Sequence, residues 1–174
     1  MRYRRLSVQL TIALLLILVG GVLSQAAAEH YGKVSWIGDG DTITVDGVGV
    51  VRLIGIDCPE KEESDRDWKF LRLGSCDWQA LRHVAQSARQ RTKELCLHQV
   101  VQLQTGEERF DRYGRLLAYV WLPDGRMLNQ LLLEEGQAIV YRRFDFSEKE
   151  NFLTLEKKAR TQQRGLWRVT KHRS

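Results

Sequence analysis

Residues that cross-link a fold or bind transition metals are scarce in this sequence of 174 residues. It has three cysteines, an odd number that leaves at least one thiol without a partner inside the chain. Cys76 and Cys96 flank a predicted helix of about 20 residues, which would hold them roughly 30 Å apart, whereas a disulfide needs Cα atoms within about 7 Å. The four histidines are scattered, and Cys96 with His98 provides too few ligands for zinc. These shortages argue against a disulfide framework and against a zinc site.

A hydrophobic run long enough to cross a membrane is also missing. The longest apolar stretch extends from about Leu10 to Leu23, which is short of the roughly 20 residues that a membrane-spanning helix needs. Three arginines precede it and three alanines follow it, the layout of a secretory signal peptide. We therefore expect residues 1–28 to be a signal peptide, with an uncleaved membrane anchor as the open alternative. Residues 29–174 form the predicted domain, exported to the periplasm or secreted.

The excess of positive charge is smaller than it first looks. The whole chain has 27 basic and 22 acidic residues, a net charge of +5. Residues 1–28 hold three arginines and no acid, so residues 29–174 have 24 basic and 22 acidic residues, a net charge of +2. Net charge alone therefore does not argue for a polyanionic partner, and the positions of the charges must decide.

Short runs of β-branched residues dominate the first part of the domain. Three of them, at 33–37, 41–45 and 49–56, are separated by Asp-Gly dipeptides, which are typical of hairpin turns. This pattern predicts a three-stranded meander. Further strands are predicted at 99–104 and 116–122, with shorter ones after the Pro123-Asp124-Gly125 turn and at 137–142.

One amphipathic helix separates the third strand from the fourth. Asp77 suits its N-cap, and apolar residues recur at intervals of three and four up to Leu95. Residues 60–75, before the helix, are charged and lack clean periodicity, which indicates a loop. The basic residues on the opposite face of the helix are interpreted as solvent-exposed: Arg82, Arg89, Arg91 and Lys93.

Two further helices are predicted near the C-terminus. Asn129 can cap a short helix through Glu135, and Ser147 with Glu150 matches a capping box for a helix to about Gln163. Strands do not alternate with helices, which disfavours a doubly wound sheet. The predicted class is α+β, mainly β: a five-stranded oligonucleotide-binding (OB) barrel with about three helices.

Two acids stand at positions that a hairpin brings together. Asp41 opens the second predicted strand and Asp57 closes the third, so antiparallel pairing places one carboxylate beside the other. Like charges held close call for a counter-cation, and oxygen ligands without histidine or cysteine suit Ca²⁺ or Mg²⁺. The alternative, that both acids only serve their turns, stays open because Asp is common in turns.

Other charged residues around these acids can serve a phosphate. Arg52 lies in the middle of a strand, where its planar fork can hold phosphate oxygens or simply extend to solvent. Glu60 can orient or deprotonate a water, or be an ordinary loop residue. In the segment DRYGR (111–115), Arg115 offers a second phosphate clamp, although the segment alone is a common turn.

These motifs occur in a specific order along the chain. DGDT is followed by VRLIGIDCPE, DRYGRLLAYV and DGRMLN, and the chain closes with GLW. In this combination the sequence resembles the staphylococcal nuclease (thermonuclease) family from about Gly32 to Trp167. The resemblance implies an OB barrel, as the strand pattern also predicts, and a calcium-dependent nuclease activity.

The resemblance assigns a role to each acid near the expected metal. Asp41 and Asp57 look like the calcium ligands, together with the backbone carbonyl of Cys58, and Asp39 looks like a supporting acid. Cys58 stands where many relatives have threonine, an exchange that a carbonyl ligand tolerates. Residues 61–76 look longer and more charged than the corresponding loop of the best-known relatives, which bears on substrate access.

The remaining positions look like the groups that act on the phosphate. Arg52 and Arg115 resemble the two arginines that stabilise the pentacovalent phosphate, and Glu60 resembles the residue that positions the attacking water. Pre-placed cations of this kind stabilise the charge that develops during hydrolysis. Contacts to the substrate are implied for Arg112 and Tyr113 at a neighbouring phosphate and for Tyr141 at a base.

The predicted function is that of an exported, Ca²⁺-dependent endonuclease. It hydrolyses phosphodiester bonds of DNA, with RNA left open, uses water as the nucleophile and leaves 3′-phosphates. We expect a monomer that touches a membrane only if residues 1–28 remain attached. Two alternatives stay open: a catalytically silent OB module that binds single-stranded nucleic acid, and an exported calcium-binding structural protein.

Overall fold

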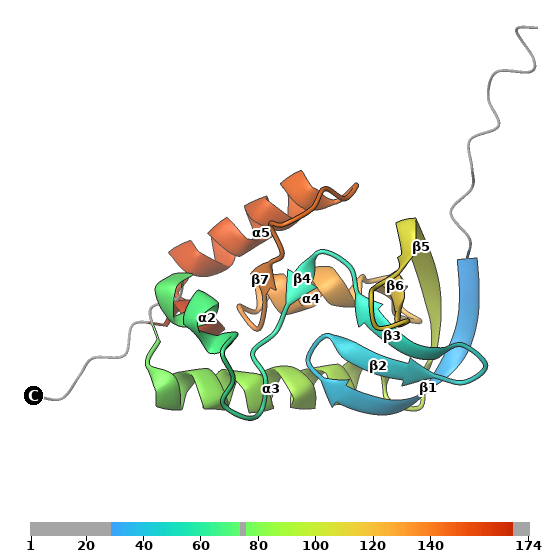
Figure 1. Cartoon of the computed structure of the whole chain (residues 1–174), viewed down its shortest axis with the longest axis horizontal. Helices are drawn as coiled ribbons and strands as arrows, with labels where there is room; N and C mark the ends of the chain where they lie inside the picture. Colours follow the sequence, from blue (N-terminus) through green and yellow to red (C-terminus); the bar gives the residue numbers. More distant parts are fainter. Residues whose placement is uncertain (1–28, 74–75, 169–174) are drawn as a thin grey trace, which may run out of the picture.

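Five strands close into a small barrel that occupies one end of the molecule (Figure 1). The computed structural model describes residues 29–73 and 76–168. The barrel strands are β1 (Glu29–Asp39), β2 (Thr42–Val45), β3 (Gly49–Leu53), β5 (Val100–Phe110) and β6 (Leu116–Trp121). They follow the order β1-β2-β3-β6-β5, with β5 pairing back to β1, and every pair is antiparallel except β3 with β6. This barrel confirms the predicted OB-like fold.

Helices make up the opposite end of the molecule. In Figure 1, α3 runs along the bottom, α5 along the top, and α2 lies at the end away from the barrel. Two short strands, β4 and β7, pair antiparallel between the helices and the barrel. The bounds of these elements are β4 (Ile56–Asp57), α2 (Asp67–Leu73), α3 (Trp78–Cys96), α4 (Leu128–Glu134), β7 (Ile139–Val140), α5 (Lys149–Thr161) and the 3₁₀ turn η1 (Gly165–Trp167).

Two apolar clusters hold the barrel and the helical end together. The larger fills the barrel and reaches α5, where the Phe152 ring is fully buried. The smaller joins Phe70 of α2 to Leu81 of α3 and to Trp167 of η1. Each fully buried side chain of this kind contributes about 1.5–3 kcal/mol of transfer free energy. The helical end is therefore packed as firmly as the barrel.

The long helix was predicted correctly. The Asp77 carboxylate accepts a hydrogen bond from the Ala80 N–H at 2.8 Å, which makes Asp77 the N-cap of α3. The predicted apolar stripe faces the protein, with Leu81, Ala85 and Ala88 buried. Trp78 is the exception, because it lies at the helix start and is 41% exposed.

Two segments predicted as loops have regular structure instead. The expected loop over 60–75 contains α2, whose seven residues are too few to display a helical period in the sequence. This helix forms because Phe70 is fully buried against α3 and the C-terminal turn. The strand predicted to end at residue 104 is longer than expected, since β5 continues to Phe110 along β6, where a loop would otherwise lead to the 111–115 turn.

Both helix caps predicted near the C-terminus are wrong. Asn129 lies inside α4, fully buried, where it accepts a hydrogen bond from Val120 N–H and donates one to the Ile54 carbonyl. Ser147 does not cap α5, because its hydroxyl lies 3.0 Å from the Tyr119 hydroxyl. In both cases a polar side chain that could cap a helix bonds a distant strand.

Three predicted strands are shorter than expected. The run 49–56 breaks after β3, because Gly55 adopts a φ of +75° and the Phe146 ring occupies the space of a Cβ there. The strand expected at 137–142 is reduced to the two residues of β7. The strand expected after the turn at Gly125 is a single bridge between Trp121 and Met127.

The basic face of α3 was interpreted wrongly as solvated. Arg89 donates hydrogen bonds to the carbonyls of Ile37 and Gly38, and Arg91 forms a bidentate pair with Glu135. Arg82 reaches the loop before α2, as described below. Three of the four basic residues therefore join α3 to neighbouring segments, and Lys93 alone fits the prediction as an exposed residue.

The predicted signal peptide, residues 1–28, lies outside the described residues. Over residues 29–73 and 76–168, no helix is long and apolar enough to span a bilayer. Cys58, Cys76 and Cys96 are all free and buried, so the described fold is held by packing and hydrogen bonds.

Candidate active site

The two acids predicted as metal ligands converge on one arginine. Thr42 pairs with Arg52 across the β2–β3 hairpin, so Asp41 lies beside the end of β3. Arg52 Nη1 forms an ion pair with Asp41, and its Nη2 lies 2.7 Å from Oδ1 of Asp57. The two carboxylates are nearly buried, and the arginine is 16% exposed. The hairpin thus brings Asp41 to Arg52, and Asp57 reaches the same arginine from β4, while the role of both acids as metal ligands remains a prediction.

Backbone groups fix the orientation of these acids. Cys58 N–H donates to Oδ2 of Asp41 at 2.5 Å, and Asp41 N–H donates to Oδ1 of Asp39 at 3.1 Å. Burial raises the pKa of the Cys58 thiol well above its usual value, and the Asp39 carboxylate raises that pKa further. The thiol is therefore protonated at neutral pH, and the peptide group of Cys58 makes the contact with the acids.

A lysine that the sequence did not single out completes this cluster. Lys69 Nζ forms an ion pair with Oδ2 of Asp57, and the side chain is 33% exposed. It comes from α2, the helix that the sequence predicted as a loop. Lys69 lies twelve residues beyond Asp57 in a run of mixed charges. Its place in the site could have been predicted only if α2 had been recognised as a helix.

A cation bound at this site would be coordinated by oxygen atoms. Among the residues that the structure describes, no group of three or more His, Cys, Asp or Glu side chains is arranged to hold a metal ion. Two buried carboxylates remain, which backbone carbonyls and water can supplement. This donor set fits a hard cation such as Ca²⁺ or Mg²⁺ and does not fit zinc. Arg52 and Lys69 now neutralise the two acids.

A cleft of about 640 Å³ opens beside this cluster. Seven arginines or lysines and four acids line it, so its wall is basic although the domain is nearly neutral. The predicted site residues in its lining are Arg52, Asp57, Arg112, Tyr113, Arg115 and Tyr141. Basic residues not predicted as part of the site also line it: Arg66, Lys69, Arg142 and Arg143. The buried Asp41 and Cys58 lie behind this wall, in contact with Arg52 and with each other.

Arg115 is held in the cleft by Asp111. Its Nε lies 2.7 Å from Oδ2 of Asp111, while Oδ1 accepts the N–H groups of Tyr113 and Arg115. Burial alone would raise the pKa of Asp111, but the hydrogen bonds from Arg115 and Tyr113 outweigh it and lower that pKa. Asp111 therefore shapes the 111–115 turn and aims Arg115, a role that the sequence did not assign to it.

Arg112 and Tyr113 form the outer edge of the cleft. Arg112 Nη2 donates to the Tyr113 hydroxyl at 2.6 Å, and the guanidinium lies 4.8 Å from the ring centroid. Tyr113 is 60% exposed, although it is a large aromatic residue. A cation and a hydroxyl are thus presented together to solvent, as a contact with a phosphate requires.

Tyr141 also lines the cleft, on a wall formed by the segment after β7. Its N–H donates to the Gly55 carbonyl at 2.9 Å, which joins this wall to the segment after β3. The ring lies 5.1 Å from the Phe144 ring, so one face is already in aromatic contact. Its neighbour Arg142 pairs with the buried Glu156 of α5, which fixes the position of the wall.

Glu60 lies apart from the other predicted residues. It does not line the cleft, its side chain is 37% exposed, and Oε1 lies 3.2 Å from Nη1 of Arg66. Arg66 does line the cleft, so Glu60 lies at its rim. The structure brings Arg52 together with both acids, and it places Glu60 apart from them, at the rim of the cleft.

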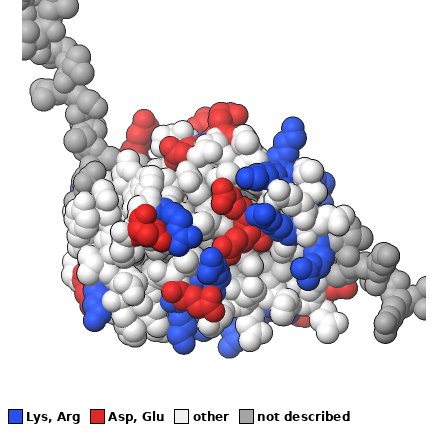
Figure 2. Space-filling model, turned by 180° about the vertical axis from the view of Figure 1, so that it is seen from behind, with Lys and Arg blue, Asp and Glu red and all other residues white. Residues whose placement is uncertain are grey.

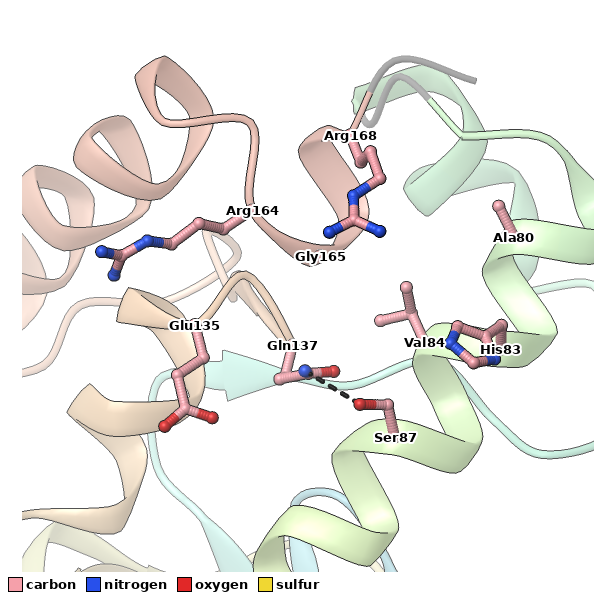
Figure 3. Close-up of a pocket in the computed structure, with 9 residues that line it drawn as sticks. All are labelled: Ala80, His83, Val84, Ser87, Glu135, Gln137, Arg164, Gly165 and Arg168. Carbon is pink, nitrogen blue, oxygen red and sulfur yellow. Dashed lines mark hydrogen bonds between the residues drawn. The ribbon is translucent and has the colours of Figure 1, made fainter. Parts of the chain in front are cut away.

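A second hollow, of about 400 Å³, lies between α3, the end of α4 and η1 (Figure 3). Gln137 donates to the Ser87 hydroxyl at 3.1 Å across its floor, and Arg168 hangs over it (Figure 3). No predicted site residue lines this hollow. The hollow is therefore a separate feature from the cluster of Asp41, Arg52 and Asp57.

Charge is mixed over the face seen from behind. Figure 2 shows acidic and basic side chains interspersed there, without a broad area of one sign. The basic wall of the cleft is therefore a local feature, in keeping with the small net charge of residues 29–174.

Comparison with known proteins matches this geometry to one family. The pattern of the staphylococcal nuclease homologue family covers residues 50–169. The thermonuclease of Staphylococcus hyicus is 32% identical over 149 residues, which cover 83% of this chain and 79% of that protein. The micrococcal nuclease of Shigella flexneri is 34% identical over 153 residues, 82% of this chain and 76% of that protein. An uncharacterized endonuclease of Escherichia coli is 34% identical over 143 residues, 80% of this chain and 78% of that protein. These findings confirm the resemblance that the motifs carried.

Proposed function

Because the chain belongs to the staphylococcal nuclease homologue family, we propose that it is a Ca²⁺-dependent endonuclease acting on DNA, with RNA left open as a second substrate. Membership makes it a nuclease, a hydrolase of phosphodiester bonds. The observation that carries the site is the contact of Arg52 with both Asp41 and Asp57 at the wall of a basic cleft.

The arginines of the cleft act on the phosphate. Hydrolysis gathers negative charge on the phosphoryl oxygens, and guanidinium groups placed beforehand stabilise that charge. Arg52 and Arg115 both line the cleft, each held by a carboxylate that fixes its orientation. The rim pair of Arg112 and Tyr113 binds a neighbouring phosphate and so aligns the strand.

Asp41 and Asp57 would hold the calcium ion, with the backbone carbonyl of Cys58. When bound, the cation supplies positive charge to the phosphate and a coordination site for water. Two nearly buried carboxylates that now require Arg52 and Lys69 as counter-charges support this assignment. The Asp39 carboxylate supports Asp41 because it accepts a hydrogen bond from the Asp41 N–H.

Glu60 orients the attacking water and accepts its proton, and cleavage leaves a 3′-phosphate. Its place at the rim, next to a cleft residue, suits a base that meets water from solvent. Water attacks the phosphorus directly, so no covalent intermediate forms. Tyr141 offers its ring to a base of the bound strand.

Residues 1–28 would direct this nuclease to the periplasm or the medium, where it acts as a monomer. The support is the arrangement of three arginines, an apolar run and three alanines in the sequence. Fractionation of cells that express the full chain, with N-terminal sequencing of the mature protein, tests this proposal. Recovery of the protein only in the cytoplasm would contradict it.

Digestion of plasmid DNA, single-stranded DNA and RNA with Ca²⁺ or with a chelator tests the activity. We expect cleavage with Ca²⁺ and loss with chelator. Arg52→Ala should lower kcat by roughly 10²–10³, as for other stabilisers of an oxyanion, and Glu60→Gln should also lower it. Arg126→Ala is the matched control, because Arg126 is exposed, does not line the cleft and, in the part of the chain that the structure describes, pairs with Asp124 alone. Equal activity in every lane would contradict the site, and binding without cleavage would favour a silent module.

A further inference from the structure

One arginine of α3 fastens the loop that carries Glu60. Arg82 Nη1 donates to the carbonyl of Glu60 at 2.6 Å and to that of Glu62 at 2.5 Å. Its Nη2 lies 2.7 Å from Oδ1 of Asp67, the first residue of α2. A single guanidinium therefore joins α3 to both ends of the segment 60–67.

Asp67 gives this contact its rigidity. It is fully buried, and a buried carboxylate requires a charged partner. Its Oδ2 accepts the N–H of Ser64 at 2.9 Å, and its Oδ1 forms the ion pair with Arg82 without hydrogen-bond geometry. Arg82 itself is 24% exposed, which leaves its contacts little competition from water.

The other end of the catalytic segment is fixed independently. Asp57 is held by Arg52, and the N–H of Cys58 is held by Asp41. Glu60 follows two residues later, and among the described residues its carboxylate is hydrogen-bonded to Arg66 at the surface. The position of the Glu60 backbone is thus set by Arg82 and not by its carboxylate.

We propose that Arg82, held by Asp67, is a positioning residue that places Glu60 relative to the Asp41–Arg52–Asp57 cluster. This inference rests on the proposed nuclease function. Arg82 touches no predicted substrate site, because it does not line the cleft. We infer that its effect on the reaction is exerted through the segment 60–67, and chiefly through the position of Glu60.

Arg82→Lys is the informative variant, because it keeps the charge beside Asp67 but lacks the fork that reaches two carbonyls. A misplacement of about 1 Å in a catalytic group costs about 10²-fold. We expect kcat to fall about 10- to 100-fold while KM changes less than about threefold, since Arg112 and Tyr113 still bind the strand. Asp67→Asn, which removes the charge that holds the fork, should move kcat in the same direction.

A double-variant cycle separates positioning from a general loss of stability. If Arg82 acts through Glu60, then Glu60→Gln with Arg82→Lys should be no slower than Glu60→Gln alone. A structural defect would instead slow both backgrounds by the same factor. Arg91→Lys is the matched control: it lies on the same helix, pairs with Glu135 and does not contact segment 60–67.

The possible failures are distinguishable. An inactive wild type with Ca²⁺ would overturn the proposed function itself. With an active wild type, a kcat of Arg82→Lys equal to that of Arg91→Lys would overturn the inference. So would additive losses in the double variant, or a Glu60→Gln variant as active as wild type. Thermal melts of each variant show whether the folded fraction at the assay temperature is the same as for the wild type.

Discussion

Lys69 is the residue whose charge bears most directly on the proposed calcium site. Its ammonium contacts the Asp57 carboxylate, so an incoming cation must displace it. We expect Lys69→Gln to tighten Ca²⁺ binding by about two- to fivefold at low salt, because removing a partly exposed ion pair changes the free energy by up to about 1 kcal/mol. Titration calorimetry in the absence of substrate measures this.

The matched control for Lys69 is Lys93→Gln, an exposed lysine on α3. Raising the ionic strength should shrink the difference between Lys69→Gln and wild type, since salt screens partly exposed charges. An unchanged calcium affinity at low salt would show that Lys69 does not compete with the cation.

Asp111 gives the site a defined response to acid. Its pKa is lowered in the folded state, mainly because the hydrogen bonds from Arg115 outweigh burial. A lowered pKa stabilises the fold above the unfolded value of about 4, and that contribution is lost as the pH falls through the lowered pKa. Unfolding free energies of wild type and Asp111→Asn between pH 6 and pH 2 measure it. The variant should show the weaker pH dependence, and identical slopes would contradict the lowered pKa.

Single residues of the site were predictable where hairpin geometry fixed them. Asp41 and Arg52 meet because the β2–β3 register determines which positions lie side by side, whereas Asp57 reaches Arg52 from β4, after the break at Gly55. Lys69 and Arg82 were missed, because their places depend on α2, which packs by tertiary contacts and has no period in the sequence. Glu60 was predicted as a site residue from the motif, but its position outside the cleft depends on the course of the segment 60–67, which the motif does not determine.

Among the elements, α4 depends on one buried side chain. Asn129 accepts from Val120 N–H and donates to the Ile54 carbonyl, so it joins α4 to β6 and to the segment after β3. Asn129→Ala should lower the unfolding free energy by about 2–4 kcal/mol, since both backbone groups lose their buried partner. Urea unfolding measures the change. Asn151→Ala, an exposed position of α5, should cost below about 0.5 kcal/mol, and equal losses would contradict the role of Asn129.

Helices and strands were predicted well when their sequence pattern was long, and poorly when tertiary contacts determined their structure. α3 has nineteen residues and an apolar stripe, and its N-cap at Asp77 was identified. β7 has two residues and α2 seven, too few for a periodic signal. Asn129 and Ser147 looked like caps, but each bonds a distant strand, which no local pattern reveals.

For the whole molecule, the cleft is a place where basic residues outnumber acidic ones. Seven basic and four acidic residues line it, while the domain as a whole is almost neutral. Binding of a single strand by Glu60→Gln with Ca²⁺ should therefore depend on salt as about four phosphate contacts do, a slope of log K against log [salt] of about −3. Fluorescence anisotropy of a labelled oligonucleotide measures it. A slope near zero would contradict strand binding in the cleft.

The parallel pairing of β3 with β6 has a consequence for how the chain matures. Val51 meets Leu116 only after α3 and β5 have been synthesised between them, so the barrel cannot close on a growing chain that ends before β6. Contacts so distant along the chain slow folding. A polypeptide that stays unfolded until most of it has left the ribosome can still be threaded through a translocation pore.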